Sequence, residues 1–439
     1  MEFFLEKISN LVWGPPLIFL LVGTHLFLSF RLRLIQRYIP LGIRLSLNFK
    51  KEGMGDISQF GALVTALAAT IGTGNIIGVA TAVASGGPGA VLWMWLTGVF
   101  GIATKYAEAL LAVKYRIKTR QGYMAGGPMY VLERGLNLKW LAILFAVFTV
   151  IASFGIGNMV QANSIAVMMQ QTFGLPLWVT GGILALLTGL VILGGIKSIA
   201  RTCQALVPFM AVFYVGGCLI LLLMKFQTIP ASLFLIVKSA FTGQAAIGGF
   251  IGAGVREVIR FGIARGLFSN ESGLGSAPIV AAAAQTRNHV RQALISATGT
   301  FWDTVVICAI TGLVIVNSGC WSQGLDGAGL AKSVFGSIPV IGPFILTVGL
   351  LTFVYSTILG WSYYGERSLE YLLGPQAVRP YRILWVIAVL IGAVSSLKNV
   401  WSFADIMNGL MAIPNLVALI CLHQVIVHDT RELLWNQKF

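Results

Sequence analysis

The chain has 439 residues, of which 57% are hydrophobic and 10% are charged, whereas a soluble globular protein carries about 45–50% apolar and about 25% charged residues. This composition excludes a water-soluble surface, and the net charge of +15 leaves membranes and nucleic acids as the partners to consider. The five cysteines form no C-x-x-C pair and the four histidines form no cluster, which argues against a disulfide scaffold and a zinc site.

Apolar runs long enough to cross a bilayer as helices of about 20 residues follow one another along the chain. They are residues 13–30, 58–84, 90–113, 140–168, 178–193, 203–224, 244–264, 292–316, 341–365, 381–396 and 402–425. The first run is long for a signal peptide and ends at Arg31 without a cleavage pattern, so we expect it to be retained. The seventh run is interrupted by Arg256, Glu257 and Arg260. The sequence therefore predicts an all-α polytopic membrane protein with about eleven transmembrane helices.

The basic residues follow one side of this arrangement. With eleven spans, all of them fall on the same side except Lys7, Lys225, Lys238, Lys332 and Lys398. Because Lys and Arg concentrate in cytoplasmic loops, we expect a multi-pass protein of the cell membrane with its N-terminus outside and its C-terminus in the cytoplasm. This topology explains the high pI and removes the reason to expect nucleic-acid binding.

Two glycine clusters lie inside apolar runs, at residues 68–75 (AATIGTGN) and 245–252 (AAIGGFIG). If each opens a repeat of five helices, the odd number of helices inverts the second repeat relative to the first. The predicted organisation is an extra N-terminal helix with a basic loop in 1–57, a first repeat in 58–225, a second, inverted repeat in 226–425 and a cytoplasmic tail in 426–439. Interrupted helices in corresponding positions indicate a transporter site, although the same glycines also fit small-x-x-x-small helix contacts.

Six motifs spread along the chain carry a resemblance to a known family. They are ALAATIGTGNIIGVA at 66–80, GGPGA at 86–90, ATKYAEA at 103–109, MAGGPMY at 124–130, FSNESGLGSAP at 268–278 and GWSYYGE at 360–366. Together they resemble the alanine or glycine:cation symporter family over nearly the whole chain, and one departure is Gly243, where many relatives have proline. The resemblance implies a LeuT-type fold of two inverted five-helix repeats, sodium coupling and small neutral amino acids as substrates.

A zwitterionic amino acid requires partners for one anion and one cation. The helix that restarts near Gly74 presents free N–H groups and a positive dipole end to a carboxylate, and carbonyls freed around 248–252 can receive the ammonium. Phe154, Asn158 and Gln161 share a helical face and are expected to line the pocket, with core packing as the alternative. The expected substrate-binding residues are Thr73, Gly74, Asn75, Phe154, Asn158, Gln161, Gly249, Phe250 and Trp361. The rings of Phe154, Phe250 and Trp361 favour alanine and glycine over larger substrates.

The resemblance also implies a sodium site made of oxygen ligands. In LeuT-type transporters a Ser/Thr pair on the third helix of the second repeat contributes to such a site, and Ser356 and Thr357 occupy that position. The carbonyls of Ala69 and Gly72, just before the first break, are expected to complete the site. The alternative for the two hydroxyls is hydrogen bonding to carbonyls of their own helix.

Acidic residues within the runs differ in depth. Asp303 lies about 18 Å into the eighth run, near the bilayer centre, where an ionisable residue predicts a functional site, so it is a further candidate ion ligand. Asp405 lies near the start of the last run and is expected to be hydrated at the interface or paired with Lys398. Lys105 and Glu108 are expected to form an i,i+3 ion pair.

The predicted function is secondary active, sodium-coupled symport of small neutral amino acids, alanine and glycine, into the cell by alternating access, with Na⁺ as the coupling ion. A proton-coupled transporter of the same fold, which would use Asp303, is the alternative. A channel would need a continuous polar pore lining, and an enzyme would need a recognisable nucleophile, base or metal constellation. The sequence contains neither pattern, so we do not expect an enzyme.

Overall fold

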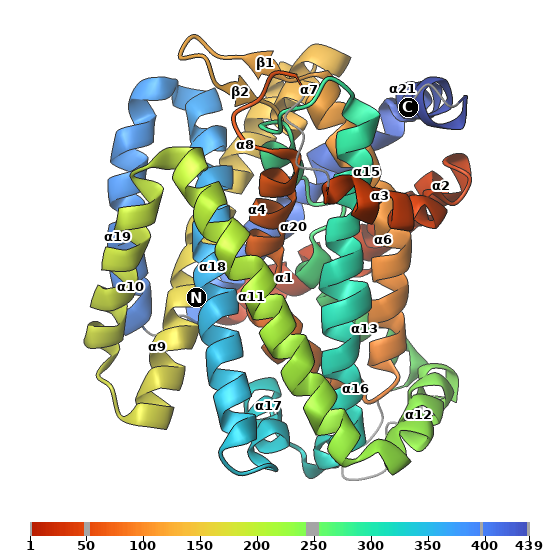
Figure 1. The fold of residues 1–439 in the computed structure, drawn as a ribbon, viewed down its shortest axis with the longest axis vertical. Helices are drawn as coiled ribbons and strands as arrows, with labels where there is room; N and C mark the ends of the chain where they lie inside the picture. Colours follow the sequence, from red (N-terminus) through yellow and green to blue (C-terminus); the bar gives the residue numbers. More distant parts are fainter. Residues whose placement is uncertain (1, 48–52, 243–253, 396–397, 437–439) are drawn as a thin grey trace.

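The computed structural model describes residues 2–47, 53–242, 254–395 and 398–436. These residues form a molecule built almost entirely of helices, most of which run along its long axis (Figure 1). Apolar segments fold this way in a bilayer because a helix satisfies its own backbone N–H and C=O groups where no water is available.

The N-terminal part precedes the first interrupted helix and contains three α-helices. Its elements are α1 (Glu2–Val12), α2 (Pro15–Arg31), the 3₁₀ turn η1 (Ile35–Tyr38) and α3 (Ile39–Ser46). The axes of α2 and the segment Ile35–Ser46 meet at 68°. Helix α2 coincides with the first predicted span, and α1, which was not predicted, packs against α20 (Lys398–Cys421).

The first half of the helical body contains the first break and a small hairpin. Its elements are α4 (Gln59–Thr70), the π segment η2 (Gly74–Gly78), α5 (Val79–Gly86), α6 (Ala90–Lys114), β1 (Ile117–Lys118), β2 (Met124–Ala125), α7 (Pro128–Leu136), α8 (Lys139–Phe154), the π segment η3 (Gly155–Met159), α9 (Val160–Phe173), α10 (Leu177–Ile192) and α11 (Gly195–Met224). Strands β1 and β2 pair antiparallel, with Ile117 opposite Ala125. Ser58 caps α4, because its side chain accepts a hydrogen bond from the N–H of Gly61 at 3.0 Å.

The second half contains a second interruption, between α13 and α14. Its elements are η4 (Phe226–Thr228), α12 (Ile229–Thr242), α13 (Val255–Asn270), α14 (Pro278–Ala281), α15 (His289–Thr300), the π segment η5 (Phe301–Cys308), α16 (Ala309–Ser318), η6 (Cys320–Gln323), α17 (Gly327–Gly336), α18 (Ile341–Leu373), η7 (Pro375–Ala377), α19 (Val378–Val394), α20, α21 (His423–Thr430) and the π segment η8 (Arg431–Trp435). Helices α12 and α17 were not predicted as elements.

The described residues include seven helices long and apolar enough to cross a membrane, or nine if each of two bent helix pairs forms one span. Two further apolar helices are shorter, Leu177–Ile192 and Phe226–Thr242. The seventh predicted span begins within residues 243–253, which lie outside the described part of the chain. The structure agrees with a polytopic all-α membrane protein, while the count of eleven and the repeat boundaries stay predictions.

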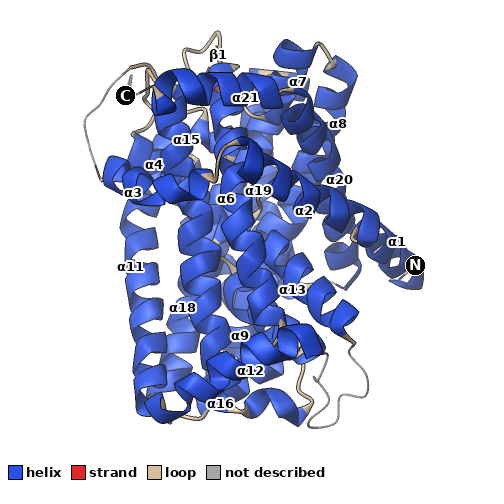
Figure 2. Cartoon of the chain, turned by 90° about the vertical axis from the view of Figure 1, so that its right-hand side faces the viewer, coloured by secondary structure: helices blue, strands red, loops and turns tan. Residues whose placement is uncertain are grey.

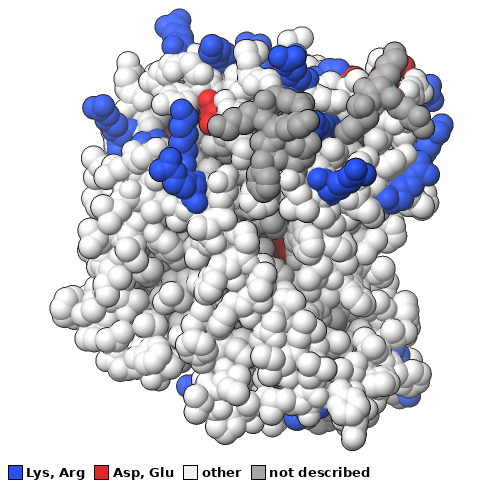
Figure 3. Space-filling view, viewed as in Figure 1, with Lys and Arg blue, Asp and Glu red and all other residues white. Residues whose placement is uncertain are grey.

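The surface separates apolar sides from a charged end. Large apolar side chains are exposed along the outward sides of α10, α11 and α19, including Leu190, Val212 and Ile383, as expected for helices that face lipid. Lys and Arg gather at one end of the molecule (Figure 3). This end, which carries α3, the β1–β2 hairpin, α7 and α21 (Figures 1 and 2), is called the basic face, and the opposite end the α17 face.

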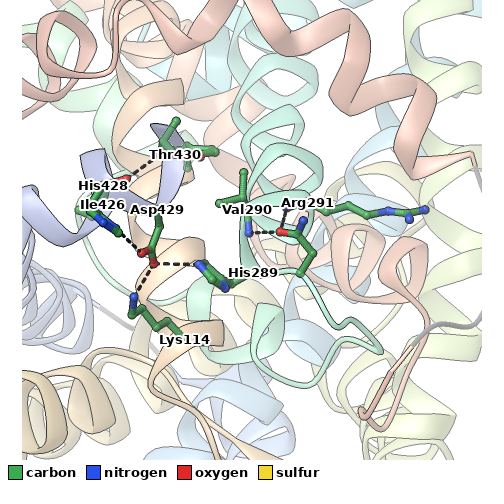
Figure 4. A network of polar contacts seen from close by, with 10 residues as sticks. Lys114, His289, Val290, Arg291, Ile426, His428, Asp429 and Thr430 are labelled. Atoms are coloured by element: carbon green, nitrogen blue, oxygen red, sulfur yellow. Dashed lines mark hydrogen bonds and ion pairs between the residues drawn. The ribbon is translucent and has the colours of Figure 1, made fainter. Parts of the chain in front are cut away.

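A polar network fastens the last helix to the basic face (Figure 4). Asp429 of α21 accepts hydrogen bonds from Lys114 at the end of α6, at 2.6 Å, and pairs with His289 at the start of α15, at 2.8 Å. His428 lies 3.5 Å from the same carboxylate. The C-terminal segment is therefore tied to two helices that are far apart in sequence.

Candidate substrate and ion site

The first break separates α4 from α5. Helix α4 ends at Thr70, and the π segment begins at Gly74. The axes of Gln59–Thr70 and Gly74–Gly86 meet at 55°. The Asn75 side chain stabilises the turn, because its Oδ1 accepts a hydrogen bond from the N–H of Gly72 at 2.8 Å. A Cβ atom at Gly72 would lie 2.6 Å from the hydroxyl oxygen of Thr357. Glycine is therefore required here for the close approach of α18.

Ser356 and Thr357 bring two hydroxyls to the end of α4. Ser356 Oγ lies 3.2 Å from the carbonyl oxygen of Ala68, and Thr357 Oγ1 lies 3.2 Å from that of Ile71. Both hydroxyls also lie close to the carbonyl of Phe353 in their own helix, at 2.8 and 3.0 Å. The hydroxyls therefore contact carbonyls of their own helix and also reach the first break, while their role as sodium ligands stays a prediction.

These five oxygens, the carbonyls of Ala68, Ile71 and Phe353 and the hydroxyls of Ser356 and Thr357, form a buried set with the chemistry that a hard cation such as Na⁺ requires. The expected carbonyls of Ala69 and Gly72 are not those that the hydroxyls contact. Ala69 and Gly72 also lie against α18, since a Cβ atom at Gly360 would be 2.7 Å from Ala69, but the two hydroxyls contact the carbonyls of Ala68 and Ile71.

A second interruption lies between α13 and α14. Helix α13 ends at Asn270, Glu271 has a left-handed backbone (φ 53°), and residues 271–277 are buried without regular structure. This stretch belongs to the motif at 268–278. The break predicted at 248–252, with Gly249 and Phe250, lies outside the described residues. Gly273 and Gly275, which both adopt positive φ, and Pro278 are the residues in the sequence that could have indicated this interruption.

Glu108 of α6 supports the second break in place of the missing helical hydrogen bonds. Its Oε1 accepts from the N–H groups of Gly273 and Gly275, at 3.0 and 3.1 Å, and from Asn415 Nδ2 at 2.7 Å. The predicted Lys105–Glu108 ion pair is not formed among the described residues, and Lys105 Nζ is buried there without a hydrogen-bond partner. The prediction failed because spacing along a helix does not reveal competing backbone donors from another segment.

Asp303 lies in the π segment η5 and joins the two breaks. Its Oδ1 accepts from Asn75 Nδ2 at 2.7 Å, and its Oδ2 accepts from Ser269 at 3.0 Å and Thr304 at 2.7 Å. The side chain is fully buried, and among the described residues it forms no salt bridge with Lys or Arg. A buried carboxylate surrounded by neutral donors is suited to hold a cation or a proton.

Gln161 and Trp361 each reach one of the breaks. Gln161 Nε2 donates to Thr73 Oγ1 at 3.4 Å and to the carbonyl of Ile156 at 2.9 Å. Trp361 Nε1 donates to Glu271 Oε1 at 3.0 Å, while Glu271 Oε2 accepts from Ser276 at 2.5 Å. Glu271 was not predicted as a site residue, since it lies between apolar segments in a stretch without helical periodicity.

Phe154 and Asn158 contact α19. The Phe154 ring packs against Tyr381 and Trp385 of α19, each with ring centroids 5.3 Å apart, and Asn158 Nδ2 donates to the carbonyl of Trp385 at 2.9 Å. The π segment Gly155–Met159 explains the difference from the prediction. It inserts an extra residue into the helical turn, so Gln161 no longer shares a face with Phe154 and Asn158.

A cavity of about 1550 Å³ leads from the α17 face to the first break. Thr73, Gly74 and Phe268 line its inner part, and Asp326 and Lys332 line the part near α17. Phe268 also lies against the first break, because a Cβ atom at Gly74 would be 3.4 Å from its ring. Phe268 is therefore an aromatic residue beside the first break that was not among the expected site residues.

Asp405 is half-buried and contacts the N-terminal part of the chain. Its Oδ2 accepts a hydrogen bond from Ser9 at 2.9 Å, and its carbonyl accepts one from Trp13 Nε1 at 2.9 Å. The side chain of Lys398, the other expected partner, lies outside the described part of the structure. Asp405 thus joins α20 to the unpredicted helix α1.

Comparison with known proteins agrees with this arrangement. The model of the sodium:alanine symporter family matches residues 1–438. The sodium/alanine symporter AgcS of Methanococcus maripaludis is 50% identical over 437 residues, covering 97% of this chain and 96% of that protein. An uncharacterized transporter of Haemophilus influenzae is 54% identical over 437 residues, covering 98% and 96%. The crystal structure of MhsT in complex with L-phenylalanine aligns with a TM-score of 0.59 at 15% identity, over 85% of this chain and 90% of that one. This likeness shows the LeuT-type fold, and the chain belongs to the sodium:alanine symporter family.

Proposed function

We propose that this protein is a secondary active transporter that couples entry of Na⁺ to uptake of small neutral amino acids, alanine and glycine first. The observation that carries the proposal is the set of five oxygens where α18 meets the end of α4, directly beside the first break. The name of the relative AgcS, a sodium/alanine symporter, supports the same ion and substrate class.

In this proposal Na⁺ is held by the carbonyls of Ala68, Ile71 and Phe353 and the hydroxyls of Ser356 and Thr357. The site needs no carboxylate, because the C-terminal end of α4 carries the negative end of the helix dipole. Ala69 and Gly72 contribute packing, since a Cβ atom at Gly360 of α18 would lie 2.7 Å from Ala69 and one at Gly72 would lie 2.6 Å from the hydroxyl oxygen of Thr357.

The amino acid lies between the two breaks, at the inner end of the cavity. Its carboxylate faces the backbone N–H groups at Thr73 and Gly74, where the helix restarts and its dipole is positive. Its ammonium faces the C-terminal end of α13 and the carboxylate of Glu271. Gln161 and Trp361 hold these two breaks in position through their hydrogen bonds.

Aromatic rings restrict the size of the substrate side chain. Phe268 lines the cavity beside Gly74, and Trp361 is fully buried against Glu271. We expect these rings to leave little more room than a methyl group needs beside the amino-acid backbone, which would favour alanine and glycine. Phe250, which lies outside the described residues, stays a predicted part of the wall that limits substrate size.

The distribution of charge gives the orientation. If the basic face lies in the cytoplasm, the C-terminus, which lies at that face (Figure 1), is cytoplasmic, and the cavity opens to the outside; the outside location of the N-terminus rests on the number of predicted spans. The structure then corresponds to an outward-facing state of an alternating-access cycle, with the substrate path closed toward the cytoplasm.

Asp303 supports a second candidate, a proton-coupled or doubly ion-coupled transporter. Its carboxylate, buried among Asn75, Ser269 and Thr304, can hold either a cation or a proton. Ion replacement on purified protein in liposomes separates the candidates. One Na⁺ entering down a potential of about 100 mV supplies roughly 2.3 kcal/mol, sufficient for about 50-fold accumulation of a zwitterion.

We expect alanine uptake to require Na⁺, to be electrogenic and to saturate. Full uptake driven by a proton gradient without Na⁺ would instead make Asp303 the coupling residue. Non-saturable flux would indicate a channel, and chemically altered alanine would indicate an enzyme.

A further inference from the structure

The inner halves of the two interrupted helices are joined at the basic face by backbone pairing. Asp56, just before α4, donates its N–H to the carbonyl of Ala283 at 2.8 Å, and Gln285 donates its N–H to the carbonyl of Ile57 at 2.7 Å. A Cβ atom at Gly55 would lie 2.4 Å from the backbone of the facing segment. Residues 54–57 and 282–286 therefore form a seam, named here the inner seam, beneath both breaks.

Arg116, which follows α6, binds both sides of the inner seam. Its Nη1 donates to the carbonyls of Ala282 and Ala284, at 2.9 and 2.7 Å, and its Nη2 donates to those of Met54 and Thr286, at 3.0 and 2.9 Å. All four are charge-assisted hydrogen bonds. The planar guanidinium presents its donors in a fixed fork, which the single ammonium of lysine cannot reproduce.

The neighbouring hairpin adds a second connection to the same place. The Asp56 carboxylate accepts a hydrogen bond from the N–H of Met124 in β2, at 2.9 Å, and β2 pairs with β1, which directly follows Arg116. Helix α6 thus holds α4 through Arg116 and the hairpin, and holds the end of α14 through Arg116. None of these residues lines the cavity that leads to the α17 face.

We propose that Arg116 is a positioning residue of the transport cycle, which fastens the inner ends of α4 and α14 to each other and to α6. With this connection the inner halves move as one unit, and the site stays closed toward the basic face while the cavity is open on the other side. Without it, the two inner ends separate independently of the ion. The inference rests on the proposed alternating-access function.

Cysteine labelling of the inner seam tests the proposal. The reporter is Ala283→Cys, a small change at a fully buried position, in full-length protein whose more accessible cysteines, Cys320 and Cys421, are replaced by serine. We expect Arg116→Ala to speed labelling from the basic face about tenfold or more. Na⁺ with alanine should slow labelling with Arg116 present and have little effect in the variant. Arg116→Lys should be intermediate, and Arg116→Gln replaces Arg116→Ala if that variant does not fold.

Arg120→Ala is the matched control, because Arg120 is an exposed arginine in the same hairpin and its removal changes the charge equally. The proposal is overturned if Arg116→Ala or Arg116→Gln labels at the rate of Arg120→Ala, whatever its melting temperature. Failure of the proposed function gives a different result, in which Na⁺ with alanine has no effect even with Arg116 present while the two arginine variants still differ.

Discussion

Removing one oxygen from the five-oxygen set is the most direct test of the ion site. Thr357→Val keeps the shape of the side chain and removes the hydroxyl that lies 3.2 Å from the carbonyl of Ile71 and 3.0 Å from that of Phe353. An interaction between a neutral polar group and a charge contributes about 1.5–3 kcal/mol. Because about 1.4 kcal/mol corresponds to a factor of ten, the Na⁺ concentration for half-maximal uptake should rise about 10- to 150-fold.

The assay is uptake of labelled alanine into proteoliposomes over a range of Na⁺ concentrations. Thr352→Val is the control, since Thr352 lies on the same helix but its hydroxyl bonds, among the described residues, only to the carbonyls of Val348 and Gly349 in its own helix. Maximal uptake at saturating Na⁺ should fall much less than the apparent affinity. If both variants raise the half-maximal Na⁺ concentration equally, the Thr357 hydroxyl is not a ligand and the reasoning is refuted.

Three further predictions concern the substrate, the buried acid and the C-terminal helix. The Phe268→Ala variant should transport leucine. The unmodified protein should bind leucine about 5- to 150-fold more weakly than alanine. If the unmodified protein binds both equally in competition assays, the Phe268 ring does not limit the size of the substrate. Asp303→Asn should reduce the charge moved per alanine, measured as current against labelled uptake, and an unchanged ratio would remove Asp303 from ion binding. Burial opposes ionisation of Asp429, yet the hydrogen bond from Lys114 and the charges of His289 and Lys114 hold its pKa below the usual range. The stabilisation by Asp429 is therefore present above the unfolded-state pKa of about 3.9 and lost as pH falls through the lower folded-state pKa. The difference in melting temperature between the unmodified protein and Asp429→Asn should be constant near neutral pH and vanish in acid. If the difference persists in acid, the ionised carboxylate of Asp429 is not the source of the stabilisation.

Hydrophobicity alone predicted the helices that face lipid, because membrane insertion requires long apolar segments whatever their partners. The first break was also readable, since Gly72, Gly74 and Asn75 interrupt an otherwise apolar run. The second break was missed because residues 271–277 are polar and glycine-rich, a composition that reads as a surface loop, although every one of them is buried. Their burial depends on Glu108, whose role is visible only in three dimensions.

Side-chain directions near the π segments could not be read from spacing. An ideal helix puts Phe154, Asn158 and Gln161 on one face, and one inserted residue at Gly155–Met159 separates them. The same limit applies to the ion site, where the pair Ser356 and Thr357 was found from the resemblance. Which carbonyls it contacts depends on how α18 rotates against the end of α4.

The contacts of helix α6 limit which segments can be exchanged between related transporters. Its Glu108 accepts hydrogen bonds from the N–H groups of Gly273 and Gly275. Its Gly101 leaves room for Ser272. Arg116, just after the helix, donates hydrogen bonds to carbonyls that follow α14. The stretch 268–286 is thus shaped by a partner more than 150 residues earlier in the chain. A chimaera that imports this stretch from a distant relative to alter substrate choice must import the matching face of α6 as well, since the stretch takes its shape from contacts with that face.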